Sequence, residues 1–228
     1  MPVRAFVFSL LLAMPVSAAG QEWQEYTSLQ DGFRLNFPGQ PSISDITWTS
    51  QLNYKLPGRV YSATKDRERY SLTVVDYSGI GQQGVERAKT CPPGNANCRS
   101  NAGPALGAGY ALHDERGAIV YATFRLLQRD AKLDYLAWDW QDLVEGHIVQ
   151  LTNADGSRTF AWVGMHAQKL YVLEGTVPAG YPEPGLFQQS MRWVDKDGNG
   201  IRYQMIYSNS FHGMGVYPAP AVVRGGGQ

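Results

Sequence analysis

The sequence predicts an α+β fold in which antiparallel strands predominate and helices are few. Its 25 glycines and 13 prolines supply many turns. Short segments between those turns alternate apolar and polar residues, which is the pattern of half-buried strands. Helical patterns are confined to short stretches. About 205 residues would remain after loss of a leader, a length that suits one domain, and no repeat or linker divides them.

Residues 1–20 have the pattern of an export signal. Arg4 provides a positive start, an apolar run follows over residues 5–16, and Ser17-Ala18-Ala19-Gly20 offers the small side chains that a signal peptidase requires. A run of about 12 apolar residues is too short to cross a bilayer as a helix. We therefore expect a periplasmic or secreted protein with no integral membrane segment in its mature form.

The N-terminal third predicts a series of antiparallel strands. Residues 33–37 (FRLNF) alternate apolar and polar side chains, and a Pro-Gly pair ends the segment. Residues 43–48 repeat the alternation more weakly. Residues 59–64 and 70–76 are rich in Val, Tyr and Thr, and the charged segment 65–69 between them is typical of a hairpin connection.

Residues 78–109 are rich in glycine and proline and leave room for one short helix, at residues 84–89. Cys91 and Cys98 lie in this stretch, within CPPGNANC. In an oxidising compartment an even number of closely spaced cysteines predicts a disulfide, and Pro, Gly and Asn between them favour a tight loop. A redox pair would favour CxxC spacing, and a zinc site would need two further ligands.

The second half predicts further strands. Apolar alternation returns at residues 118–127. Residues 132–153 fit either a helix or a strand, and Gly146 favours a strand for the later part, because glycine weakens a helix. Residues 158–163 and 169–177 then complete a three-strand meander.

The C-terminal part predicts one helix and one strand. Residues 184–193 predict a helix, because Glu183 and Pro184 stand at its first turn, where an acidic group and a proline are favoured. Residues 201–207 predict the final strand. We expect residues 211–228 to form a mobile tail. The single domain therefore spans residues 21–210, with the disulfide-containing loop near 78–109.

Several segments resemble PsbP-like domains, including small bacterial envelope proteins of that type. In that family a strand ending in FPG opens the sheet, a strand of the form LYVL precedes an acidic or proline-rich loop, and a helix of the form FxxS closes the fold. The resemblance covers roughly residues 26–203 and implies an antiparallel sheet with helices packed on its faces, an α/β/α sandwich. It also implies an accessory or binding module, although fold alone assigns no role. The matching segments are DGFRLNFPGQP, RVYSATKDRERYSLTV, KLYVLEGTVP and LFQQSMRWVDKDGNGIRY.

Trp138 and Trp140 are the first candidate binding residues. Two positions apart on a strand, they would lie on one face, and with Tyr135 near them they would form an aromatic platform for a sugar or a peptide. Packing in the core explains the same pattern. If the indoles are exposed, a carbohydrate or cell-wall ligand becomes the leading partner.

Asp195, Asp197 and Asn199 resemble the start of a calcium loop, because oxygen ligands alternate and Gly200 occupies the sixth position. The twelfth position holds Ile206 instead of a bidentate carboxylate. A turn in which Asp, Asn and Gly adopt left-handed backbone angles is the simpler interpretation. We therefore expect no metal and no cofactor.

Four polar residues define the competing enzymatic hypothesis. A hydrolase would require two or more of His113, His147, Asp139 and Glu145 to converge in a pocket. The segment of His113, Asp114 and Glu115 is polar, which predicts a solvated turn. The acidic residues around Asp139 are typical of the wet side of a strand or helix.

The charge balance excludes some classes of partner. Lys and Arg number 20, as do Asp and Glu, so no dominant sign attracts nucleic acid. The sequence therefore predicts a non-enzymatic binding or accessory module of the bacterial envelope. Its partner would be an unknown envelope protein or a small ligand, and the alternative is a periplasmic hydrolase whose site is assembled only in the fold.

Overall fold

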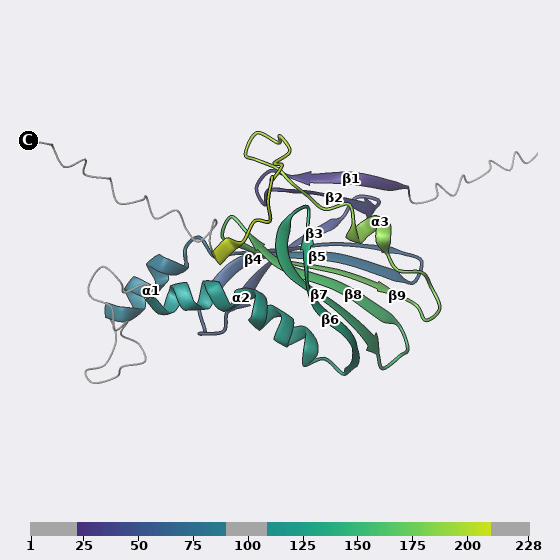
Figure 1. Ribbon diagram of the computed structural model, residues 1–228, viewed down its shortest axis with the longest axis horizontal. Helices are drawn as coiled ribbons and strands as arrows, with labels where there is room; N and C mark the ends of the chain where they lie inside the picture. The colour runs from purple at the N-terminus through teal and green to yellow at the C-terminus, as the bar shows by residue number, and fades with distance from the viewer. Residues whose placement is uncertain (1–21, 90–108, 211–228) are drawn as a thin grey trace, which may run out of the picture.

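The computed structural model describes residues 22–89 and 109–210, and its main feature is a seven-stranded antiparallel sheet with the order β3-β4-β5-β9-β8-β7-β6 (Figure 1). A three-stranded sheet with the order β1-β2-β10 accompanies it. The fold is thus α+β with strands predominant, as the sequence predicts. The elements are β1 (Trp23–Ser28), β2 (Phe33–Pro38), β3 (Ser42–Thr49), β4 (Lys55–Lys65), β5 (Glu68–Asp76), α1 (Ile80–Lys89), α2 (Gly109–Leu127), β6 (Ala131–Gln141), β7 (Val144–Asn153), β8 (Arg158–His166), β9 (Lys169–Val177), α3 (Gly185–Gln188) and β10 (Arg192–Trp193).

The two faces of the large sheet are covered differently. Helix α2 packs against strands β7, β8 and β9 and pairs with α1. The small sheet and the short helix α3 lie on the other face, so the molecule has three layers (Figure 1). Successive side chains of a strand point to opposite faces of the sheet, so each strand contributes to both cores. On β5, Leu72 and Val74 belong to the core beneath the small sheet, whereas Val75 belongs to the core beneath α2.

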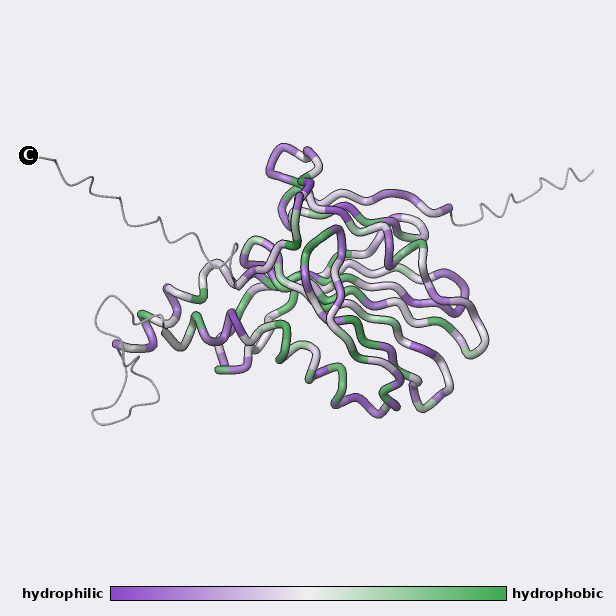
Figure 2. Tube along the Cα trace, in the orientation of Figure 1, coloured by the Kyte–Doolittle hydropathy of each residue, from purple (hydrophilic) through white to green (hydrophobic). Residues whose placement is uncertain are grey.

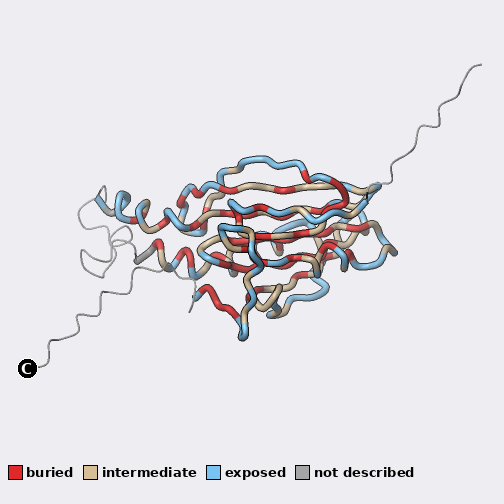
Figure 3. Tube along the Cα trace, turned by 90° about the horizontal axis from the view of Figure 1, so that it is seen from above, coloured by how far each residue is buried: buried red, intermediate tan, exposed pale blue. Residues whose placement is uncertain are grey.

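The tube alternates between hydrophobic and hydrophilic colours along the strands of the large sheet (Figure 2). Buried residues concentrate in the central strands, whereas exposed residues gather in the connections and along the outer strands (Figure 3). Alternation of this kind is the signal that predicted the N-terminal strands, and their bounds confirm it. The charged connection between β4 and β5 is a tight hairpin, with Lys65 paired to Glu68 and Asp66 at a φ of 53°.

Asp31 joins the small sheet to the large one. Its side chain is buried, with 1% exposed, in the turn after β1. The hydroxyl of Tyr61 on β4 donates to Oδ2 over 2.6 Å, and Nζ of Lys169 on β9 lies 3.0 Å from Oδ1. The hydroxyl of Tyr171 donates to the backbone oxygen of Asp31 over 2.7 Å. Strands from both sheets are thereby fixed to one carboxylate.

The expected alternation at residues 118–127 does not form a strand, because these residues are the second half of helix α2. Ala118, Ala122 and Leu126 are buried at a spacing of four, which is the spacing of one helix face. Val120 and Phe124 lie between them and are 62% and 52% exposed. Apolar residues on both helix faces therefore gave the appearance of a period of two.

Residues 132–153 form two strands, β6 and β7, joined by a tight hairpin. Gly146 does lie in a strand, and the structure gives the reason for a glycine there. A side chain at Gly146 or at its cross-strand partner Gly164 would collide with the ring of Trp162. The two glycines therefore provide the surface on which this indole packs.

Two predictions for the C-terminal part are wrong in extent. The helix expected at residues 184–193 is the four-residue α3, because the chain then extends to pair Arg192 and Trp193 with β2. Residues 201–207 form no strand. They are irregular, and Tyr207 makes only an isolated bridge to Val144. Ile201, Tyr203 and Tyr207 of this segment pack against the core beneath the small sheet instead.

Candidate ligand-binding site

Strand β6 carries the largest group of exposed apolar side chains. It is the last strand of the large sheet, and no other described strand pairs with its outer edge. Five of the thirteen exposed large hydrophobic residues of the described chain lie on it. Natural proteins usually protect such an edge with charges or a covering segment, so a row of apolar side chains there indicates an interaction surface.

Trp138 and Trp140 lie side by side on this strand. They are 51% and 45% exposed, and their ring centroids are 5.3 Å apart with planes inclined by 56°. The register pairs Trp138 with His147 and Trp140 with Glu145. His147 contacts Thr123 on α2, so both indoles lie on the face of the sheet that α2 covers at the more central strands. The expectation that these two side chains share a face is confirmed.

Leu133 and Leu136 extend this row along the strand. They pair with Leu151 and Val149, two residues of the core beneath α2, and they are 44% and 43% exposed. A bulge between Leu133 and Tyr135 keeps Leu133 on this face despite the odd spacing. We call the four residues Leu133, Leu136, Trp138 and Trp140 the indole strip.

Tyr135 does not belong to the indole strip. It is 51% exposed, but it lies three positions from Trp138 with no bulge between them, and alternation places it on the opposite face of the strand. The aromatic platform that the sequence predicted therefore consists of two indoles, and Tyr135 lies on the other side of the same edge.

Polar groups on β7 border the indoles. Nδ1 of His147 lies 2.9 Å from the hydroxyl of Thr123 on α2. Burial lowers the pKa of His147, although the nearby carboxylate of Glu145 acts in the opposite direction. A neutral imidazole and a carboxylate thus lie next to the two rings, where they can accept or donate hydrogen bonds to a ligand.

Two of the four residues of the enzymatic hypothesis lie together, and the other two lie elsewhere. His147 and Glu145 share a face of β7, but Asp139 lies on the opposite face of β6, paired with Gly146. His113 is exposed on α2, on the outward side of the helix. A site that combined nucleophile, base and orienting group would need closer approach.

Asp114 and Glu115 are a feature that the sequence analysis missed. Both carboxylates lie on helix α2 and are 1% exposed, whereas the polar pattern predicted a solvated turn. The hydroxyl of Ser50 and the backbone N–H of Leu52 donate to Asp114, and the amide of Asn209 donates to Glu115 over 3.3 Å. Burial raises the pKa of both carboxyls. They fasten surrounding segments to the helix.

A groove of about 750 Å³ lies between the C-terminal half of α2 and strands β3, β5 and β9. The guanidinium of Arg125 stacks over the ring of Trp48 at 4.2 Å, and Arg129 forms a two-point ion pair with Glu174. These groups satisfy one another, as is typical of a structural surface. The sequence analysis singled out none of them, because they come from distant segments.

The remaining candidates are a turn and a pair of cysteines. The side-chain amide of Asn199 donates to Oδ2 of Asp195 over 3.1 Å, and the backbone N–H groups of Asp197 and Asn199 donate to Oδ1. The side-chain bond from Asn199 first, and then these backbone bonds, lower the pKa of Asp195. The segment is thus a self-contained turn, and the described residues hold no cluster of three or more metal-ligating side chains. Cys91 and Cys98 lie outside the described residues, as do the leader and the tail.

Comparisons with known proteins add no relative. No protein-family model matches the chain, and the comparison with curated proteins likewise gives no match. Within the described residues, no helix combines the length and the apolar character needed to cross a membrane. The function must therefore be inferred from the geometry of the described residues.

Proposed function

We propose that this protein is an exported binding module of the bacterial envelope, that it performs no catalysis, and that its ligand binds to the indole strip. The exposure of Trp138 and Trp140 on one face of an edge strand is the observation that carries the proposal. Large aromatic side chains are seldom left in water in this way unless they meet a partner.

A PsbP-like arrangement is part of the proposal. The motifs that resemble this family lie in β2, β9 and α3, and the antiparallel sheet with helices on one face supports the assignment. The second face departs from a simple α/β/α sandwich, because the small sheet occupies it and α3 has only four residues. The proposal therefore concerns the type of fold and assigns no activity.

A saccharide chain of the cell wall is the ligand that we favour. The C–H face of a sugar ring packs on an indole, and its hydroxyls need polar neighbours such as His147 and Glu145, which pair with the two tryptophans across the strands. Two rings in adjacent positions on the face would contact successive sugar units. Trp138 and Trp140 would thus supply most of the affinity.

Co-sedimentation with isolated cell-wall sacculi tests this proposal. W138A and W140A should each weaken binding by roughly tenfold or more, because truncation of a central aromatic contact has effects of this size. F124A is the matched control, since Phe124 is 52% exposed on α2 and lies outside the indole strip. Absence of binding by the wild-type protein, or equal binding by all four proteins, would contradict the proposal.

An extended polypeptide segment is the second candidate ligand. It is favoured by the unpaired outer edge of β6 and by exposed side chains on both faces of that strand. Tyr135 distinguishes the two ligands. A strand that adds to the edge covers both faces, so Y135A should weaken its binding, whereas a saccharide on the indole face should be indifferent to Y135A.

Export is tested by the mass of the protein recovered from the envelope fraction. We expect a chain that lacks residues 1–20 and is two hydrogens lighter than its reduced form, because Cys91 and Cys98 would be joined. A full-length chain with free thiols in the cytosolic fraction would contradict both the localisation and the disulfide.

A further inference from the structure

A hollow of about 370 Å³ lies where the small sheet meets the tip of the β6–β7 hairpin. Three arginines line it, namely Arg34 from β2, Arg192 from β10 and Arg202 from the irregular segment that follows. Asp142, at the hairpin tip, is the one carboxylate among the lining residues. The lining therefore carries a net charge of about plus two and attracts anions. We call this site the arginine hollow.

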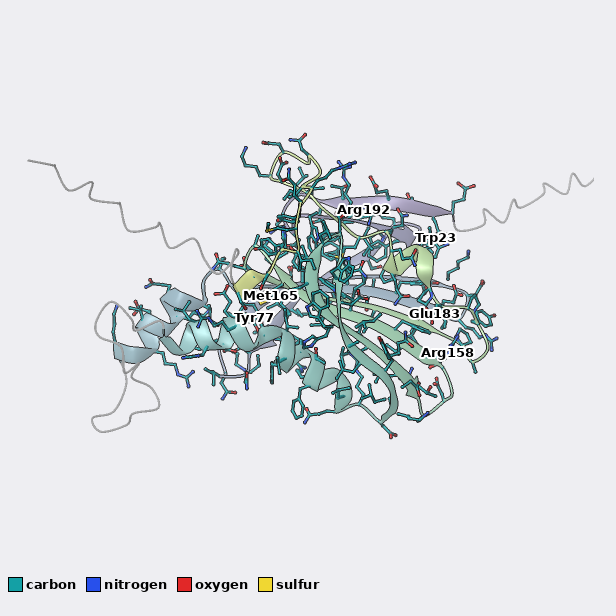
Figure 4. The ribbon with its side chains drawn as sticks, in the orientation of Figure 1. Trp23, Tyr77, Arg158, Met165, Glu183 and Arg192 are labelled. Carbon is teal, nitrogen blue, oxygen red and sulfur yellow. The ribbon has the colours of Figure 1, made fainter. Side chains whose placement is uncertain are left out.

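Arg34 and Arg192 are direct partners in the pairing of β2 with β10. Direct partners on antiparallel strands project their side chains to the same face, about 5 Å apart, and like charges in this position destabilise a sheet. Figure 4 labels Arg192 at the small sheet, to which β10 belongs. The chain thus keeps two positive charges side by side at this hollow, although the pair is unfavourable for the sheet. This indicates that their combined charge serves to bind a ligand.

The hydrogen bonds of Arg34 and Arg192 orient the guanidinium groups and go to uncharged acceptors. Nη2 of Arg34 donates to the oxygen of Gly198 over 2.6 Å, while its Nε is buried with no hydrogen-bond partner in the described chain. Glu25 forms a long, exposed ion pair with that Nε at 3.9 Å, which compensates the charge of Arg34 only in part. Nη1 of Arg192 donates to the backbone oxygens of Gln189 and Met191. These acceptors are neutral carbonyls.

The hairpin wall of the hollow is rigidly held. Asp142 and Leu143 adopt φ values of 45° and 63°, which a leucine seldom takes. The backbone N–H of Tyr207 donates to Leu143, and the indole N–H of Trp193 donates to the oxygen of Gln141. These φ values are the ones that a two-residue type I′ hairpin turn requires, so the hairpin itself fixes the shape of this wall. The arginine hollow is thus formed before any ligand arrives.

We propose that the arginine hollow binds the phosphate group of a small molecule or of a lipid headgroup. One guanidinium group can pair with both oxygens of a carboxylate. A phosphate has oxygens in several directions and carries nearly two negative charges, so it can pair with several guanidinium groups. Arg34, Arg192 and Arg202 come from three segments and can each meet a different oxygen. The volume is sufficient for a phosphate with a small attached group.

Thermal unfolding and calorimetric titration of the full chain test this proposal, with inorganic phosphate and glycerol phosphate as soluble probes. Glycerol phosphate should raise the melting temperature of the wild-type protein in a saturable manner. R192Q and R202Q should each weaken its binding about tenfold or more, the effect of one lost charge-assisted hydrogen bond. Arg202 is exposed in an irregular segment, so R202Q tests binding without disturbing a strand.

K89Q is the matched control, because it also removes one positive charge and Lys89 lies on α1, beneath the other face of the sheet. Vesicles of phosphatidylglycerol, compared with vesicles of phosphatidylcholine, distinguish the source of the phosphate. Binding to the anionic vesicles alone, lost in R192Q and R202Q, would identify a lipid headgroup. No saturable binding of any probe, or equal binding by R192Q, R202Q and K89Q, would overturn the proposal.

Discussion

The guanidinium of Arg59 holds the carboxylate of Asp31 at two points: Nε donates to Oδ2 over 2.7 Å, and Nη2 donates to Oδ1 over 2.5 Å. Asp31 lies in the turn of the small sheet and Arg59 lies on β4 of the large sheet. Together with Tyr61 and Lys169, this pair fastens the two layers to each other. The stability of the interface between the sheets therefore depends on one buried charge.

Replacement of Asp31 should strongly destabilise the protein. D31N leaves Arg59 and Lys169 without their common partner, and loss of one partner of a buried ion pair costs about 3 kcal/mol or more. Urea denaturation at neutral pH measures the change. D45N is the matched control, because Asp45 is exposed on β3 and its variant should unfold like the wild type. Equal midpoints for D31N and D45N would contradict this role for Asp31.

The pH dependence of stability at Asp31 follows from its lowered pKa. Burial raises the pKa, but the hydrogen bonds from Arg59, Tyr61 and Lys169 outweigh burial and lower it below the ordinary 3.8. The unfolded chain therefore binds this proton first as the pH falls. The stabilisation is complete above pH 3.8 and is lost as the pH falls through the folded-state pKa. The free energy of unfolding of the wild type should therefore fall over this acidic range, and that of D31N should show no such fall.

Asp114 should behave in the opposite way. Burial raises its pKa, so the folded state holds the proton more tightly than the unfolded state and stability falls as the pH rises above 3.8. D114N removes this decline. At neutral pH we expect D114N to lie within about 1 kcal/mol of the wild type, since a buried charge is replaced by a neutral group of similar shape. A loss as large as that of D31N would contradict this expectation.

His166 should make the protein sensitive to mild acid. Its side chain is 4% exposed, Nε2 lies 2.6 Å from the hydroxyl of Tyr203, and burial lowers its pKa from 6.5 to about 4. The unfolded chain takes up this proton near pH 6.5, so stability falls by roughly 3 kcal/mol between pH 6.5 and 4 and then levels off. Subtracting the curve of H166Q from that of the wild type isolates this step, and parallel curves would contradict it.

The packing of Trp162 predicts the effect of adding one methyl group. G164A places a side chain against the indole and against the backbone oxygen of Glu145. Overpacking of this kind costs about 3 kcal/mol, which corresponds to a fall in melting temperature of roughly 6 to 12 °C for a chain of this size. G79A is the control, because open space surrounds Gly79. An unchanged melting temperature for G164A would show that Trp162 can move aside.

Sequence patterns predicted most strands, because alternation in a half-buried strand is local. They misassigned α2, since Val120 and Phe124 are apolar yet face water, and the spacing of four among Ala118, Ala122 and Leu126 was obscured. The C-terminal irregular segment was predicted as a strand because apolar residues recur along it. Ile201, Tyr203 and Tyr207 pack against the core without forming a regular strand, whereas Met205 and Ile206 are exposed.

The candidate sites also differ in whether a local sequence pattern indicates them. Trp138 and Trp140 were found from the sequence because both lie on one strand, whereas their exposure depends on how far α2 extends over β6. Arg34 and Arg192 are close only through the pairing of β2 with β10. No local pattern brings such distant residues together, so the arginine hollow could be found only in the folded chain.

Residues near the C-terminus complete the surroundings of His166. Tyr203 contacts its imidazole, the hydroxyl of Tyr207 accepts the N–H of Ala167, and Asn209 accepts the N–H of Gln168. Tyr203 follows His166 by 37 residues, so the β8–β9 turn acquires these partners well after its own residues have been synthesised. A nascent chain that ends before residue 203 consequently lacks the groups that surround His166 and the β8–β9 turn.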